Sequence, residues 1–108
     1  MSTTQSPYVR CYWTGSLFLI NGKVMPIHCT NISTKMIEVE APSGIEGSKM
    51  VKLELKAMHE GRRKLIKVLC DPELDILNEH NKHYLKFKFH TIAKSDVEFI
   101  KQYVDYHS

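Results

Sequence analysis

The chain has 108 residues, a formal net charge of +3, and 43% hydrophobic and 25% charged residues. These values are ordinary for a soluble globular protein and predict one domain, residues 1–108, with a single core. The mild positive charge permits an anionic ligand but does not by itself indicate nucleic acid. No apolar run approaches the length of a membrane span, and residues 17–20 are too short for the core of a signal peptide.

The cysteines are Cys11, Cys29 and Cys70, an odd number at wide spacing. This pattern predicts reduced thiols rather than a disulfide framework, because disulfides are rare in reducing compartments. We therefore expect a cytoplasmic protein with free thiols.

The N-terminal part of the chain predicts a tail followed by a β-hairpin. Residues 1–7 are small and polar, which is typical of a flexible tail. A strand over residues 17–20 is followed by Asn21-Gly22, the strongest short hairpin signal, and by a return strand over residues 23–29. Pro26 within the return strand indicates a sheet edge or a bulge.

Three further strands are predicted over residues 36–40, 51–57 and 62–70. Their apolar residues recur at every second position, so one face of each strand should be buried. The Pro-, Gly- and Ser-rich residues 41–47 form a loop. Residues 59–61 form a turn so short that the strands on either side should pair antiparallel.

The region after residue 70 predicts a short helix and a last strand. Asp71-Pro72-Glu73 is typical of a helix start, with Asp as the cap and Pro at the first helical position. Leu74 and Leu77 would anchor one or two turns. A polar loop over residues 78–82 then leads to a strand over residues 85–89.

The C-terminal segment predicts a longer helix. Ser95 and Glu98 have the spacing of a capping box, in which each side chain bonds the other residue's backbone N–H. Val97, Ile100 and Val104 share one helical face, which Phe99, Tyr103 and Tyr106 widen. Many short strands followed by one helix favour a small antiparallel barrel or a folded sheet, with the helix over an open end or face. We predict a mostly β fold, a small antiparallel six-stranded β-barrel with a C-terminal α-helix.

The sequence offers little support for catalysis or metal binding. No nucleophile, base and acid are legible as a set, although such groups need not be adjacent in sequence. Glu38 and Glu40 alternate as on a solvated strand face. His80 and His83 are spaced like ligands on a helix, but residues 78–82 are a predicted loop. His28 and Cys29 are adjacent, so on a strand they point to opposite faces. We expect no enzyme, no metal and no cofactor.

Basic residues gather at residues 62–64 and at Lys82, Lys86 and Lys88. Phe87 and Phe89 interleave with the second group, as in some nucleic-acid-binding sheets. Alternation nevertheless places the aromatic rings and the lysines on opposite faces, which is the pattern of a plain core strand. We therefore expect no DNA or RNA partner.

A short polar stretch, residues 30–36, lies between two strand-like runs and contains Asn31-Ile32-Ser33. Asn and Ser hydrogen-bond nearby backbone and favour tight turns, so a chain reversal alone would explain them. The order of the elements around this stretch indicates a further role for it. The Asn21-Gly22 hairpin comes before this stretch, the strand over residues 36–40 and Gly47 come after it, and residues 84–89 precede the last helix.

This order resembles a PilZ domain, the bacterial family of cyclic di-GMP receptors, over residues 6–104. The resemblance implies two ligand motifs: Arg-x-x-x-Arg before the first strand, and Asp/Asn-x-Ser-x-x-Gly between the second and third. Arg10, Asn31 and Ser33 match parts of these motifs. Ser6 stands where the first arginine is expected, and Met36 stands where glycine is expected. Guanidinium groups bind phosphate and stack on guanine, and glycine lets a backbone approach a ligand, so both departures fall on ligand contacts.

The resemblance implies a stand-alone, non-enzymatic cyclic di-GMP signalling adaptor in the bacterial cytoplasm, with nucleotide binding weakened or lost. The alternative is a non-binding PilZ-like protein-interaction module, for example in type IV pilus biogenesis or motility. Either would act through a protein partner or by self-association.

Overall fold

The computed structural model describes residues 8–108; the predicted tail, residues 1–7, and Ser6 within it lie outside the described residues. The described part contains the following strands and helix: β1 (Val9–Arg10), β2 (Thr14–Phe18), β3 (Val24–Ile32), β4 (Met36–Ala41), β5 (Val51–His59), β6 (Arg62–Leu77), β7 (His83–Ile92) and α1 (Lys94–His107).

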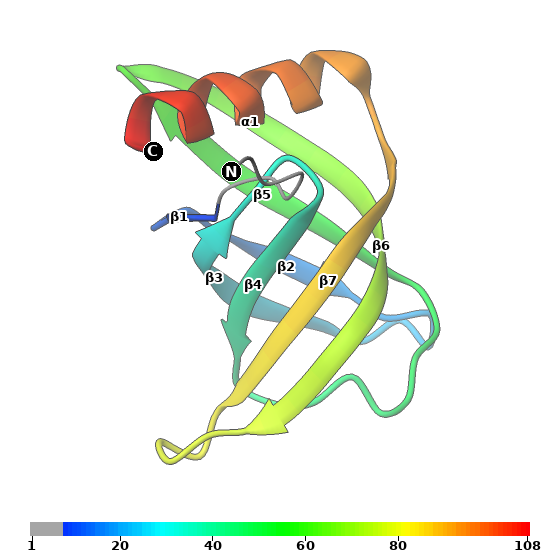
Figure 1. The fold of residues 1–108 in the computed structure, drawn as a ribbon. Coiled ribbons are helices and arrows are strands. Elements are labelled where there is room, and N and C mark those ends of the chain that lie inside the picture. Colours follow the sequence, from blue (N-terminus) through cyan, green and yellow to red (C-terminus); the bar gives the residue numbers. More distant parts are fainter. Residues whose placement is uncertain (1–7) are drawn as a thin grey trace, which may run out of the picture.

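The strands form a closed antiparallel barrel (Figure 1). Their order is β1-β3-β2-β5-β6-β7-β4, and β4 also pairs with β3, so six strands close on themselves while the two-residue β1 adds to β3. The predicted six-stranded barrel with a C-terminal helix is confirmed. Closure leaves no long unpaired edge among these six strands, which removes a common site of unwanted strand pairing.

The hairpin predicted at Asn21-Gly22 is present. Gly22 has a φ of 91°, a backbone conformation that glycine adopts without a steric penalty. The two strands pair from Thr14 with His28 to Phe18 with Val24. Pro26 faces Ser16 of β2 on one side, and β3 does not reach β4 until His28, so the proline occupies an edge position as expected.

The helix predicted to start at Asp71 is absent. Residues 71–77 instead continue β6, a 16-residue strand that pairs with β7 as far as Leu77 and His83. The register shifts between Pro72 and Leu74, which accommodates a residue that lacks a backbone N–H. Leu74 is 40% exposed instead of anchoring a helix. Long-range pairing with β7 therefore overrides a local helix-start signal.

The terminal helix begins at Lys94, and Ala93 caps it without a side-chain hydrogen bond. The predicted capping box is therefore wrong, because Ser95 already lies within the first turn. Asp96 lies in that turn too, where a negative charge is favourable, and it pairs with Lys64 at 3.1 Å.

The buried face of the helix holds Asp96, Phe99, Ile100, Tyr103 and Val104. The burial of Ile100 and Val104 agrees with the sequence pattern. Tyr106 is mostly exposed and Val97 only half-buried, so the packed face is shifted from the one predicted.

The core fills the barrel interior and extends under α1. The alternation predicted for three strands holds, since Ile37, Leu53, Leu55 and Ile66 are completely buried. Cys11, Cys29 and Cys70 are free, as predicted, and all three are buried. The helix in the described part of the chain is too short and too polar to cross a membrane.

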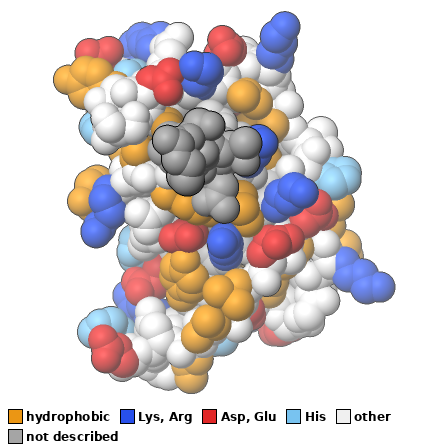
Figure 2. All heavy atoms as spheres, viewed as in Figure 1, with side chains coloured by type: hydrophobic (Ala, Val, Ile, Leu, Met, Phe, Trp, Pro, Cys, Tyr) orange, Lys and Arg blue, Asp and Glu red, His pale blue; other side chains and the backbone are white. Residues whose placement is uncertain are grey.

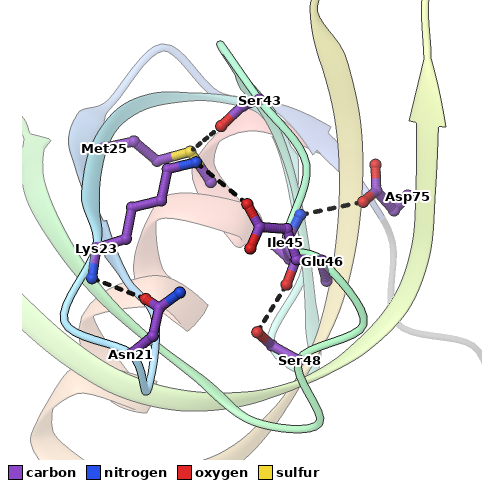
Figure 3. A network of polar contacts seen from close by, with 8 residues as sticks. All are labelled: Asn21, Lys23, Met25, Ser43, Ile45, Glu46, Ser48 and Asp75. Carbon is purple, nitrogen blue, oxygen red and sulfur yellow. Dashed lines mark hydrogen bonds and ion pairs between the residues drawn. The ribbon is translucent and has the colours of Figure 1, made fainter.

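Residues 42–50 form a loop that closes the barrel end opposite α1 (Figure 3). Ile45 is buried in the core, and its backbone N–H donates to Asp75 Oδ2 at 3.2 Å. Asp75 Oδ1 also lies 2.6 Å from His83 Nδ1. A Cβ atom on Gly44 would lie 2.8 Å from Asp75 Oδ2 and 2.9 Å from His83 Cε1, so only glycine fits this approach without a shift.

Candidate functional site

Arg10 and Asn31, far apart in sequence, are directly opposed in the structure. They face each other in the short ladder between β1 and β3. The Arg10 guanidinium is exposed and lies 5.7 Å from the centre of the Tyr12 ring. The Arg10 carbonyl accepts a hydrogen bond of 2.9 Å from the Tyr103 hydroxyl of α1, which fixes the backbone of this short strand.

Glu38 of β4 is the next residue across the sheet. It is opposite Asn31 in the β3–β4 ladder, and the Asn31 Nδ2 group donates to Glu38 Oε1 at 3.0 Å. On its other side Glu38 is opposite Lys86 of β7. Opposed residues share one face of a sheet. Arg10, Asn31, Glu38 and Lys86 therefore form a line across four strands on the outer surface, which we call the polar row.

Two tyrosines flank the carboxylate of the polar row. Burial, a hydrogen bond with Glu38 and the charge of Glu38 raise the pKa of Tyr84. Burial and the charges of Glu38 and Glu73 raise the pKa of Tyr8 to about 12. Burial disfavours the ionised form of both tyrosines, and the neighbouring negative charge disfavours it further. Lys86 Nζ lies 5.9 Å from the centre of the Tyr8 ring.

Ser33 is held inside the turn between β3 and β4. It is 2% exposed, and its Oγ accepts hydrogen bonds from the backbone N–H groups of Lys35 at 3.2 Å and Met36 at 3.0 Å. The Ser33 N–H donates to the Met36 carbonyl at 2.8 Å. These contacts are those of a turn-forming serine. Ser33 shapes the loop beside Asn31, and its hydroxyl is engaged by the chain itself.

Met36 is the first residue of β4 and is opposite Lys88 of β7. The described non-glycine residues with positive φ are Glu46, Glu60 and Asn81, so Met36 occupies ordinary strand backbone without strain. Because side chains two positions apart share a strand face, Met36 lies on the same outer surface as Glu38. Its effect on a ligand there would be one of bulk.

The sequence pattern predicted that the carboxylates of β4 form a solvated face. The structure does not bear this out. Glu38 and Glu40 are half-buried. Glu40 Oε2 accepts from Asn78 Nδ2 at 2.8 Å, and Glu40 Oε1 lies 3.4 Å from His28 Nε2. Sequence reasoning missed Glu38 as a member of the site. The alternation of β4 was legible, but the register that sets Glu38 against Asn31 was not.

The surface over β4 and β7 carries charges of both signs (Figure 2). Lys, Arg, Asp and Glu side chains lie close together there instead of forming a patch of one sign. Phe87 is buried while Lys86 and Lys88 lie on the outer side, as the alternation predicted. No group of three or more His, Cys, Asp or Glu residues within residues 8–108 could hold a metal ion.

A groove of about 850 Å³ lies at the barrel end covered by α1, and we call it the helix-end groove. It is bounded by the tip of the β5–β6 hairpin, residues 12–14 and the C-terminal part of α1. No sequence pattern predicts this groove, because it combines three segments far apart in the chain. Its lining includes Tyr12, Trp13, Met58, His59, Arg63, Leu65, Tyr103, Tyr106 and His107.

Comparisons with known proteins identify the fold. No protein-family model and no curated protein sequence matches the chain. The solved structure of an inhibitor of motility from Bacillus subtilis, MotI/DgrA, superposes with a TM-score of 0.83 at 15% identity, over 98% of this chain and 51% of that protein. The PilZ domain of YcgR from Escherichia coli with cyclic di-GMP superposes with a TM-score of 0.65 at 6% identity, over 98% of this chain and 92% of that domain.

This chain has a PilZ-like fold. The resemblance drawn from the order of the strands is thus confirmed at the level of the fold. The chain spans about half the length of MotI/DgrA. Sequence identities this low support a shared fold but not a shared ligand. Any ligand must therefore be inferred from this chain's own residues.

Proposed function

We propose that this chain is a non-enzymatic PilZ-like signalling adaptor in the bacterial cytoplasm, one domain over residues 1–108, which binds cyclic di-GMP weakly or not at all and acts through a protein partner. One observation carries the proposal. The Asn31 amide, the group that the motif would offer to the nucleotide, already donates to the Glu38 carboxylate.

The charges of the polar row support weak binding. Cyclic di-GMP carries two phosphate anions, which Arg10 and Lys86 of the row would attract and Glu38 would repel. A like charge several ångströms away costs about 1–3 kcal/mol near a protein surface. A missing charge-assisted hydrogen bond, such as one from an arginine in place of Ser6, costs roughly 1.5–3 kcal/mol. Each effect corresponds to roughly a ten- to hundredfold loss of affinity.

Calorimetric titration with cyclic di-GMP tests the proposal on the intact chain. The wild-type protein should bind weakly or not detectably. Glu38→Gln removes the negative charge and should tighten binding by about tenfold. Ser6→Arg combined with Met36→Gly restores the arginine and removes the bulk, and should tighten binding by tenfold or more.

Glu54→Gln is the matched control, since Glu54 is a half-buried carboxylate that pairs with Lys52 on β5, away from the polar row. It should leave the titration unchanged. Submicromolar binding by the wild-type protein would refute weak binding. No binding by the combined Ser6→Arg, Glu38→Gln and Met36→Gly variant would mean that Arg10 and Asn31 are not a nucleotide site.

That last outcome would favour the second candidate function, a PilZ-like module that binds proteins alone, for example in type IV pilus biogenesis or motility. The helix-end groove supports this candidate because it is mainly apolar and its lining includes none of the motif residues Arg10, Asn31 and Ser33. The resemblance of the fold to an inhibitor of motility is in keeping with such a role.

A further inference from the structure

The floor of the helix-end groove is a set of fixed aromatic rings. The Trp13 ring lies 4.6 Å from that of Tyr103, and the Tyr103 ring lies 4.3 Å from that of His107. Trp13 Nε1 donates to the Met58 carbonyl at 2.9 Å, which ties the floor to the β5–β6 hairpin. A floor held in this way loses little freedom when a ligand binds.

Large apolar side chains remain exposed around the groove. Tyr12 is 74% exposed, Tyr106 65%, Leu65 52% and Met58 48%. They come from residues 12–14, α1 and both strands of the hairpin, whose tip runs beside the C-terminal part of α1 (Figure 1). Single exposed apolar residues are ordinary, but a group of four around one concave surface marks a contact site.

The charges beside these residues are mainly positive. Met58 is opposite Arg63 and Lys56 is opposite Leu65, so apolar and cationic side chains alternate on the hairpin. Lys64 is engaged by Asp96, and Glu60 lies beside His59. Among residues 8–108, Arg63 and Lys56 have no ion-pair partner, which leaves two cations available at the groove.

We infer that the helix-end groove docks an acidic, amphipathic segment of a partner protein. Its aromatic or aliphatic side chain would enter the groove against Tyr106 and Leu65, and its carboxylates would meet Arg63 and Lys56. The inference rests on the proposed adaptor role and names the surface and the chemistry of the partner.

Charge favours a foreign segment over a second copy of the chain. A two-fold symmetric contact through this groove would set the cations of one copy against those of the other. Like charges brought together across an interface oppose binding, whereas acidic residues on a partner would be attracted. The groove is also concave, which suits a protruding side chain.

The test is a selection of random 12-residue peptides displayed on phage against the wild-type protein, followed by anisotropy titrations of the enriched peptides. The enriched sequences should combine Asp or Glu with Trp, Phe or Leu. Leu65→Glu places a charge in the apolar contact, and Arg63→Glu reverses a rim charge. Each should weaken these peptides by at least about tenfold.

Leu69→Glu is the matched control, because Leu69 is an exposed leucine on the same strand, four residues from Leu65, and does not line the groove. It should leave the affinities unchanged. The inference is overturned if enriched peptides are basic, if none depends on Leu65 and Arg63, or if Leu69→Glu weakens them equally.

Two other occupants have their own signatures. Sedimentation showing a dimer that Leu65→Glu dissociates would assign the groove to a second copy and overturn the inference. Binding to phosphatidylserine vesicles that Arg63→Glu abolishes, with no acidic peptide enriched, would overturn it in favour of a membrane surface. None of these results depends on the cyclic di-GMP titration, so failure of the docking inference is distinguishable from failure of the proposed function.

Discussion

The two ends of the barrel are closed in different ways. At one end, residues 42–50 fold over the opening. Ile45 enters the core, and its backbone N–H donates to Asp75, which in turn pairs with His83. At the other end, α1 lies across the opening (Figure 1), and its contacts with Trp13 and His59 are mainly between rings.

This difference separates a sealed end from an end that can take a partner. The loop is held by directional hydrogen bonds, and its apolar residue Ile45 is buried. The helix covers the core with Ile100 and Val104 but leaves Tyr106 exposed beside the groove. One helix therefore has two roles. Its buried face stabilises the barrel, and its exposed tyrosine contributes to the groove.

The largest expected effect is at the buried face of α1. Ile100 is completely buried, so Ile100→Ala should reduce the free energy of unfolding by roughly 2–5 kcal/mol through lost burial and a cavity. Urea unfolding measures the change. Lys101→Ala is the control, since Lys101 is exposed and its pairing with Asp105 lies on the helix surface. A melting temperature within a degree of wild type for Ile100→Ala would contradict the packing described.

The loop end should respond less, and locally. Asp75→Ala removes the acceptor of the Ile45 N–H and the partner of His83, which should cost about 1–3 kcal/mol. Hydrogen exchange should accelerate at Ile45 while the amides of α1 stay protected. Glu73→Ala, an exposed carboxylate on the same strand, is the control. Equal acceleration at both ends would show that the two closures are not independent.

Alkaline pH should weaken the fold at both ends. Burial raises the pKa of Cys70 from 9.0 to about 12, and Cys70 is opposite Val51, the first residue after the loop. The unfolded chain loses this proton first, so stability is intact below about pH 9 and falls as pH rises toward about 12, by up to about 1.4 kcal/mol per pH unit.

Burial likewise raises the pKa of Tyr103 at the helix end. Unfolding free energies measured between pH 8 and pH 11 should therefore fall less steeply in Cys70→Val and in Tyr103→Phe than in wild type. A slope unchanged by both substitutions would show that these groups titrate alike in the folded and unfolded chains.

The smallest effect should come from the rim of the groove. Leu65 is half exposed, so Leu65→Ala should change the free energy of unfolding by no more than about 0.5 kcal/mol. Thermal melting monitored by circular dichroism is sufficient. A loss comparable to that of Ile100→Ala would mean that Leu65 belongs to the core and that the groove is not a free surface.

Local sequence signals predicted much of the barrel because they act over a few residues. Asn21-Gly22 specifies its turn, and alternation specifies the inner faces of β4 and β5. The same locality explains the errors. Asp71-Pro72-Glu73 has a helix-start pattern, but β7 offers residues 71–77 a full ladder of backbone partners. Ser95 and Glu98 have capping-box spacing, but the helix is capped two residues earlier, at Ala93.

The candidate site was predictable only in part for a related reason. Resemblance to a family supplied Arg10 and Asn31, and the structure makes them neighbours. Glu38 enters the site through the register between β3 and β4, which depends on how the whole barrel closes. The helix-end groove depends on the rings of residues 13, 59 and 103, which come together only in the folded chain. No short sequence pattern predicts that they are in contact.

The hydrogen bond from the Tyr103 hydroxyl to the Arg10 carbonyl connects the helix-end groove with the polar row. Tyr103 lines the groove, and Arg10 begins the polar row. A segment that displaces Tyr103 on docking would also displace Arg10, and the reverse holds for an anion drawn to Arg10. Thermodynamic linkage requires the two effects to be equal in free energy. Peptide affinity measured with and without an anion at Arg10 would therefore give the coupling in both directions at once.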